Sequence, residues 1–212
     1  MPTSARGLTQ PERVELSNRR LVEAAAELIT EKGWEATTAA EIGRRAGYSR
    51  AMVHARYGSK DAILDAIFEH GDVQRLLPAP VPGATGMANA VAHFLRIEEM
   101  YAHDPAFLRA MFVMTFEAVK TTSPVRARLR TWFERGVSAV DAGLRLGIDD
   151  GSVRADVDIE RAVNDISAAG FGLAFHWIVQ GERYELDREM AFTRERIVGD
   201  YGTEGPRPRK RR

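Results

Sequence analysis

The chain has 212 residues, of which 44% are hydrophobic and 28% charged, an ordinary composition for a globular protein. It contains no cysteine, which excludes disulfide bonds and thiol chemistry and favours a reducing compartment. No apolar run approaches the roughly 20 residues that a membrane-spanning helix needs, and residues 1–11 are polar. We therefore expect a cytoplasmic protein with no membrane partner.

The formal net charge is zero, but the charges are unevenly distributed. The first 60 residues hold ten Arg and Lys residues against seven Glu, and residues 42–60 contain no acidic residue. A second basic cluster lies at 207–212. A local excess of positive charge is what binding to the phosphates of nucleic acid requires.

The N-terminal third of the sequence predicts a series of helices separated by short turns. Residues 1–14 contain Pro2, Gly7 and Pro11 and predict a flexible arm. A first helix is expected over 16–32, ended by Gly33. Thr38 and Glu41 form a capping-box pattern that opens a second helix ending near residue 46. Further helices are expected over 50–57 and 60–77, after the capping residues Ser49 and Ser59.

The remaining two thirds are also predicted to be helical. Prolines at 78, 80 and 82 exclude a helix there. Apolar periodicity predicts longer helices over 87–103, 105–119, 124–146, 159–180 and 186–201, with a loop at 147–158. Residues 203–212 predict a disordered basic tail. The expected fold class is therefore all-α.

The stretch 37–60 has the organisation of a helix-turn-helix, with two helices of about nine residues joined by a tight turn at Gly47. Ile42 and Ala46 define the inward face of the first helix, and Val53 and Tyr57 that of the second. The second helix is predicted to point five residues outwards, a surface suited to reading bases: Arg50, Ala51, Met52, His54 and Arg56.

These residues carry a family resemblance. The run Leu21–Ile29, followed by Glu31-Lys32-Gly33-Trp34, Thr37-Thr38, Glu41-Ile42, Arg44-Arg45-Ala46-Gly47, Ser49 and Tyr57-Gly58-Ser59-Lys60, resembles the N-terminal domain of TetR-family repressors. Two departures are His54, where the family usually has Tyr, and Tyr57, where it usually has Phe.

The resemblance implies a DNA-binding role for ten residues. Thr38 and Lys60 correspond to phosphate contacts at helix N-termini. Arg50, Ala51 and His54 correspond to positions that contact base edges, where Arg50 could pair with guanine and Ala51 could meet a thymine methyl. The full expected set is Thr38, Arg44, Arg45, Ser49, Arg50, Ala51, Met52, His54, Arg56 and Lys60.

The resemblance also implies a domain organisation: a flexible arm at 1–14, a three-helix helix-turn-helix domain at 15–60, a larger helical effector-binding and dimerisation domain at 61–202, and the tail at 203–212. Met and aromatic residues gathered in the middle helices predict an apolar effector pocket. The expected lining residues are Phe94, Met100, Phe107, Met111, Phe112, Phe116, Trp132 and Phe133. The expected homodimer interface comprises Gly170, Phe171, Ala174, Phe175 and Ile178.

The function that follows is a ligand-responsive repressor that binds a palindromic, double-stranded operator as a homodimer and is released by a small, largely apolar effector. We expect no enzyme activity, no cofactor and no metal, because neither a metal-ligand spacing nor a nucleophile motif occurs. Two alternatives remain open. One is a helical carrier or sensor that has lost DNA binding, which the His54 departure would favour; the other is a DNA-packing protein without sequence preference.

Overall fold

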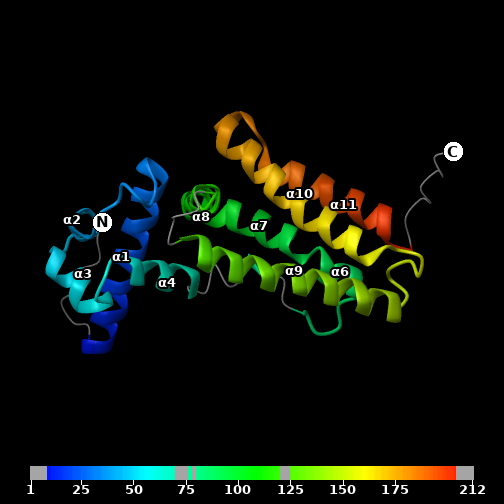
Figure 1. Cartoon of the computed structure of the whole chain (residues 1–212), viewed down its shortest axis with the longest axis horizontal. Helices are drawn as coiled ribbons and strands as arrows, with labels where there is room; N and C mark the ends of the chain where they lie inside the picture. The colour runs from blue at the N-terminus through cyan, green and yellow to red at the C-terminus, as the bar shows by residue number, and fades with distance from the viewer. Residues whose placement is uncertain (1–8, 70–75, 78–79, 120–124, 204–212) are drawn as a thin grey trace.

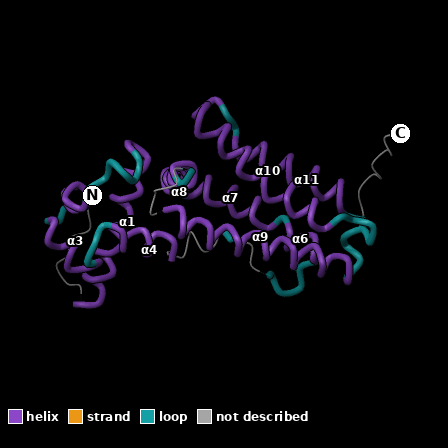
Figure 2. The backbone as a smooth tube through the Cα atoms, in the orientation of Figure 1, coloured by secondary structure: helices purple, strands orange, loops and turns teal. Residues whose placement is uncertain are grey.

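A computed structural model describes residues 9–69, 76–77, 80–119 and 125–203. The described residues are helical, and their only β-type pairing is an isolated bridge between Val153 and Gly202 (Figure 2). The all-α prediction is confirmed. The helices are α1 (Gln10–Lys32), α2 (Ala39–Arg45), α3 (Arg50–Tyr57), α4 (Asp61–Glu69), α6 (Gly86–Ala90), α7 (Ala92–His103), α8 (Pro105–Glu117), α9 (Val125–Asp149), α10 (Ile159–Gln180) and α11 (Leu186–Tyr201), with a 3₁₀ turn η1 (Gly181–Arg183).

The start of α1 corrects the sequence-based prediction. The helix begins at Gln10 rather than at residue 16, and so includes residues 10–14 of the expected arm. Thr9 and Glu12 form a capping box, and Pro11 occupies the first turn, where its missing N–H costs nothing. The end at Gly33 is confirmed, since this glycine has a φ of 80°.

The short helices α2 and α3 form as predicted. The Thr38 hydroxyl and the Glu41 carboxylate cap each other's backbone amides at the start of α2. Gly47 makes the turn with a φ of 78°, and the Ser49 hydroxyl accepts from Met52 at the start of α3. Ser59 likewise accepts from the amide of Ala62 in α4. The predicted continuation of this helix over 70–75 lies outside the described residues.

Two predictions for the middle helices are wrong. The single helix expected over 87–103 is divided into α6 and α7 at Val91, whose ψ of 5° leaves the helical range. In addition, α9 continues through Gly147 to Asp149 instead of ending at residue 146. A Cβ atom at Gly147 would lie 2.3 Å from Val153 and 3.1 Å from the amide of Met87. This glycine therefore allows α6 to cross α9 closely and does not end the helix.

The apolar core consists of two clusters along an elongated molecule (Figure 1). The first joins α1–α4 to α8, and the second lies among α6–α11. Ile63 and Ile67 of α4 and Met114 of α8 belong to the first cluster. The predicted domain boundary at residue 60 therefore does not separate two independent cores, because residues of α4 and α8 complete the core of the helix-turn-helix.

Candidate DNA interface and ligand cavity

The outward face of α3 presents a compact group of polar and small side chains. Arg50, Ala51 and His54 are exposed, as predicted. Nδ1 of His54 lies 2.9 Å from the carbonyl oxygen of Gly58, and Nε of Arg50 lies 3.4 Å from Nε2 of His54. Nδ1 is therefore assigned as a donor and Nε2 as an acceptor. The two side chains are positioned together on one surface, ready to contact an external partner.

Three further members of the expected DNA-binding set are exposed in and around the two short helices. Thr38 precedes α2, Arg44 lies within it, and Ser49 precedes α3. Arg45 is also exposed but forms ion pairs with Glu27 (2.9 Å) and Glu31 (2.8 Å) of α1. The two carboxylates partly neutralise the field of the Arg45 guanidinium and so weaken its attraction to DNA phosphates. The same ion pairs hold α2 against α1.

Three members of the expected DNA-binding set are partly buried. Met52 packs against the first core cluster, and Arg56 has a buried Nε. The ammonium group of Lys60 donates to the carbonyl oxygens of Trp34 (3.0 Å) and Thr37 (2.9 Å) and lies 4.5 Å from the centre of the Trp34 ring. The outward orientation predicted for Met52 is corrected: α3 is short and packs on two sides.

The capping carboxylate of α2 is also an anchor to α1. Glu41 accepts from the ammonium group of Lys32 at 2.6 Å and from the Thr38 hydroxyl at 2.7 Å. These two contacts lower the pKa of Glu41 to about 2. The N-terminus of α2 is thereby held in place, and with it the backbone amides that could face a phosphate.

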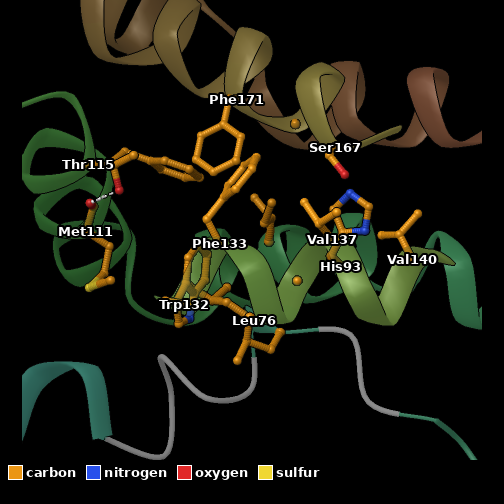
Figure 3. Close-up of a pocket in the computed structure, with 15 residues that line it drawn as sticks. Leu76, His93, Met111, Thr115, Trp132, Phe133, Val137, Val140, Ser167 and Phe171 are labelled. Atoms are coloured by element: carbon orange, nitrogen blue, oxygen red, sulfur yellow. Dashed lines mark hydrogen bonds between the residues drawn. The ribbon is translucent and has the colours of Figure 1, made fainter. Parts of the chain in front are cut away.

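A cavity lies between α7, α8, α9 and α10 (Figure 3). Its atom-free space is about 670 Å³, part of it open to solvent. Its described walls carry no charged side chain. The lining residues are Leu76, Leu77, His93, Ile97, Met111, Phe112, Thr115, Trp132, Phe133, Gly136, Val137, Val140, Ser167, Gly170 and Phe171.

Four of the eight expected pocket residues line this cavity: Met111, Phe112, Trp132 and Phe133. The other four do not. Phe94 is fully buried in the second core cluster and Phe107 is buried in the first. Met100 is partly buried against both clusters, and Phe116 packs edge-on against Phe175 with ring centres 5.5 Å apart. Composition alone could not separate the helix face toward the cavity from the face toward the core.

The polar lining residues were not predicted. His93 is one of two histidines of α7, and its position in the sequence does not distinguish a structural role from contact with a cavity. Its ring lies next to α10, where a Cβ atom at Gly170 would be 3.8 Å from it. Burial lowers the pKa of His93 to about 4, and the backbone of Ile166 and Ala90 opposes this only in part. His93 is therefore neutral near pH 7.

The expected dimer interface is only partly on the surface. Gly170 and Phe171 border the cavity, and Ala174 is fully buried in its own chain. The expectation is corrected for Gly170 and Ala174, because positions 170, 174 and 177 form the inward face of α10. Ile178 is partly buried, while Phe175 is 53% exposed. The exposed apolar residues Val179 of α10 and Phe192 of α11 were not predicted.

A polar junction connects the helix-turn-helix to the rest of the chain. At the end of α8, the Glu117 carboxylate accepts from the backbone amide of Trp34 at 2.6 Å. Arg128 of α9 donates to Asp65 of α4 at 2.9 Å. Three residues of α8, at positions 111, 112 and 115, also line the cavity. One helix therefore contacts both the cavity and the loop before α2.

Within the part of the chain that the structure describes, no group of three or more His, Asp or Glu side chains could hold a metal ion. None of the described helices combines the length and the apolar character needed to cross a membrane.

Comparisons with known proteins agree with this geometry. The family model "Bacterial regulatory proteins, tetR family" matches residues 21–67. The HTH-type transcriptional regulator HbdR of Aromatoleum sp. (strain CIB) is 25% identical over 166 residues, 77% of this chain. The alignment spans 63% of that relative, less than two thirds of its length.

Solved structures show a similar overall fold. SmeT, the repressor of the Stenotrophomonas maltophilia multidrug efflux pump SmeDEF, in a complex with triclosan, has a TM-score of 0.73 at 22% identity, covering 92% of this chain and 99% of that one. FadR from Bacillus subtilis in complex with stearoyl-CoA has a TM-score of 0.70 at 19% identity, covering 85% and 97%. At these identities the similarity concerns the fold.

Proposed function

We propose that the chain is a homodimeric repressor of transcription of the tetR family of bacterial regulatory proteins, whose family model matches residues 21–67. In this proposal it binds a palindromic operator, and a small, largely apolar effector releases it. Members of the family regulate transcription by binding DNA, and for this chain we propose which residues contact the operator and which cavity binds the effector.

The observation that carries the proposal is the exposed, acid-free helix α3 at the end of the molecule. Arg50 and His54 are held together on its surface, with Ala51 beside them. A guanidinium group suits the two acceptors of guanine in the major groove, and the Ala51 methyl suits a thymine methyl. Exposed Thr38, Arg44 and Ser49 would contact phosphates on either side.

The cavity supports the effector part of the proposal. Its walls are apolar and uncharged in the described part of the chain, as small-molecule sites commonly are. Structural relatives are described in complex with triclosan and with stearoyl-CoA, which supports small-molecule binding by this fold. A ligand changes operator affinity only if it binds the two states of the protein unequally. Because α8 borders the cavity and holds Trp34, we propose it as the coupling element, together with α4.

The test of DNA recognition is selection from a random-sequence duplex library, followed by sequencing. The wild type should enrich a palindrome, and Arg50→Ala and His54→Ala should each lose preference at particular bases. Arg145→Ala is the matched control, because this exposed arginine of α9 pairs only within its helix, with Asp141, among the ion pairs of the described residues. It should recover the wild-type motif.

The two alternatives predict different results. A folded dimer that enriches no motif would support the carrier or sensor function. Enrichment of all sequences alike, with affinity that collapses as salt is raised, would support DNA packing.

A further inference from the structure

The cavity contains a polar corner in an otherwise apolar wall. The two ring nitrogens of His93 and the hydroxyl oxygen of Ser167 are buried, and none makes a hydrogen bond of standard geometry in the described structure. The backbone of Ile166 and Ala90 lies near enough to the His93 ring to oppose the lowering of its pKa, but not in the geometry of a full hydrogen bond. Figure 3 shows the Ser167 hydroxyl pointing toward the His93 ring at one end of the cavity. Buried polar atoms without partners cost free energy, and they are rare in folded proteins.

The rest of the lining is aromatic and aliphatic. The rings of Phe133 and Phe171 lie 5.5 Å apart, and Phe171 also meets Phe112 edge-on at 6.4 Å. The rings of Phe133 and Phe171 lie between the polar corner and the end of the cavity formed by Thr115 and Met111 (Figure 3). The hydroxyl of Thr115 already donates to the carbonyl of Met111 at 2.8 Å and is therefore occupied. Among the described lining residues, the polar side-chain atoms without a hydrogen bond are therefore the two His93 nitrogens and the Ser167 hydroxyl at this corner, and Nε1 of Trp132 elsewhere in the wall. His93 and Ser167 are the two that lie together.

Gly170 leaves room at the same corner. It lies within α10 and has no positive φ, so the backbone does not require glycine. A Cβ atom there would lie 3.8 and 3.9 Å from two atoms of the His93 ring, an ordinary contact distance. The absence of a side chain at Gly170 keeps space open beside the His93 ring.

We propose that this cavity binds a neutral, mainly aromatic molecule whose single hydroxyl or carbonyl group hydrogen-bonds with His93 and Ser167. The inference rests on the proposed function, in that it names the chemical class of the effector. A carboxylate would be excluded, because the described walls offer it no positive charge and an unpaired buried anion is costly. Wholly apolar molecules would bind more weakly, because they would leave both polar groups unpaired.

Direct binding of three probes of similar shape tests the inference without DNA: 2-naphthol, naphthalene and 2-naphthoate, measured by calorimetry at pH 7.5. For the wild type we expect 2-naphthol to bind about 10-fold more tightly than naphthalene, the size of one or two buried hydrogen bonds. We expect no detectable binding of 2-naphthoate.

Substitutions locate the effect. Ser167→Ala and His93→Phe should each reduce the preference for 2-naphthol over naphthalene by about 3- to 10-fold while naphthalene binding persists. Gly170→Ala should weaken both neutral probes, because its methyl group fills the corner, and it should fold normally in a helix. Ser138→Ala is the control, an exposed serine of α9 that does not line this cavity.

Equal binding of naphthalene and 2-naphthol, tight binding of 2-naphthoate, or no binding of any probe would overturn the inference. Failure of the regulatory proposal would give a different result. If 2-naphthol binds as expected but leaves the affinity for a selected operator unchanged, the ligand class stands and the effector response does not.

Discussion

Single residues in this protein serve two requirements at once. His93 is half-buried at the cavity, but its two ring nitrogens are buried and the ring is neutral near pH 7. The same removal from water that leaves the nitrogens available to a ligand makes protonation of the ring in acid destabilise the folded state. Gly33 likewise combines a backbone requirement with a packing requirement. It ends α1 with φ 80° and ψ 167°, a region that only glycine adopts readily, and it leaves space for the Glu117 carboxylate.

The burial of His93 predicts a pH dependence of stability. Its folded pKa is about 4 and its ordinary value is 6.5, so the unfolded chain binds a proton more readily between these values. The contribution to stability is therefore fully present above pH 6.5 and is lost as pH falls from 6.5 toward 4. From pH 7 to pH 4.5, wild type should lose about 1–3 kcal/mol more unfolding free energy than His93→Phe, measured with urea. Parallel curves for the two proteins would contradict this.

Substitution of Gly33 should reveal the crowding by Glu117. Gly33→Ala forces a side chain into an unfavourable φ and toward the Glu117 carboxylate, and should lower the unfolding free energy by about 2–4 kcal/mol. Gly83→Ala is a matched control, because Gly83 also has a φ of 80° but a Cβ atom there would have no neighbour within 4 Å. If both variants lose the same stability in thermal and urea unfolding, the contact with Glu117 is unimportant.

Among the elements, α8 connects the two functional regions. Its residues 107, 110, 111 and 114 complete the core of the helix-turn-helix, while residues 111, 112 and 115 line the cavity. At its C-terminus, Glu117 holds the amide of Trp34 in the loop before α2. A ligand that displaces α8 would therefore move the loop that orients α2 and α3.

Glu117→Ala tests this connection. Loss of a charged acceptor leaves the Trp34 amide unpaired and should lower the unfolding free energy by about 1–3 kcal/mol. It should also bring the ratio of operator dissociation constants with and without 2-naphthol closer to one, measured by fluorescence anisotropy. Glu99→Ala, at an exposed position of α7, should change neither quantity. An unchanged ratio in a destabilised Glu117→Ala protein would limit Glu117 to a structural role.

At the scale of the whole molecule, the outer surface of α10 and α11 lacks a partner in the single chain. Phe175 and Val179 are 53% and 66% exposed one helical turn apart on α10, and Phe192 of α11 is 64% exposed. Exposed apolar residues gathered on neighbouring helices favour association. A two-fold dimer through this surface would place two α3 helices for the two halves of a palindrome.

Replacement of two of these side chains should dissociate the dimer. The double variant Val179→Glu, Phe192→Glu should raise the dimer dissociation constant by at least about 100-fold, because each protomer loses two buried apolar side chains and gains two charges in the interface. Analytical ultracentrifugation measures this constant, and operator binding should weaken in parallel. Leu146→Glu, at a 45% exposed position of α9, is the control and should leave the dimer intact. A fully dimeric double variant would place the interface elsewhere.

Local patterns in the sequence were enough to predict the all-α fold, most helix boundaries and the helix-turn-helix. These depend on local signals: the Thr38–Glu41 capping box, the glycines at 33 and 47 and the apolar spacing of each helix act within a few residues. The start of α1 at Gln10 also depends on local signals, the Thr9–Glu12 capping box and Pro11, although it was not predicted.

The faces along which the longer helices meet could not be predicted in this way, because they depend on packing between distant parts of the chain. An apolar helix position can face the core, a cavity or a second chain, and its identity alone does not distinguish them. Thus Phe94 lies in the core, Phe171 borders the cavity and Val179 is exposed, although all three are apolar residues within predicted helices. The polar corner at His93 and Ser167 likewise depends on the packing of α7 against α10, which joins residues 74 positions apart. Such long-range pairings depend on the packing of the whole chain, and local patterns do not encode them.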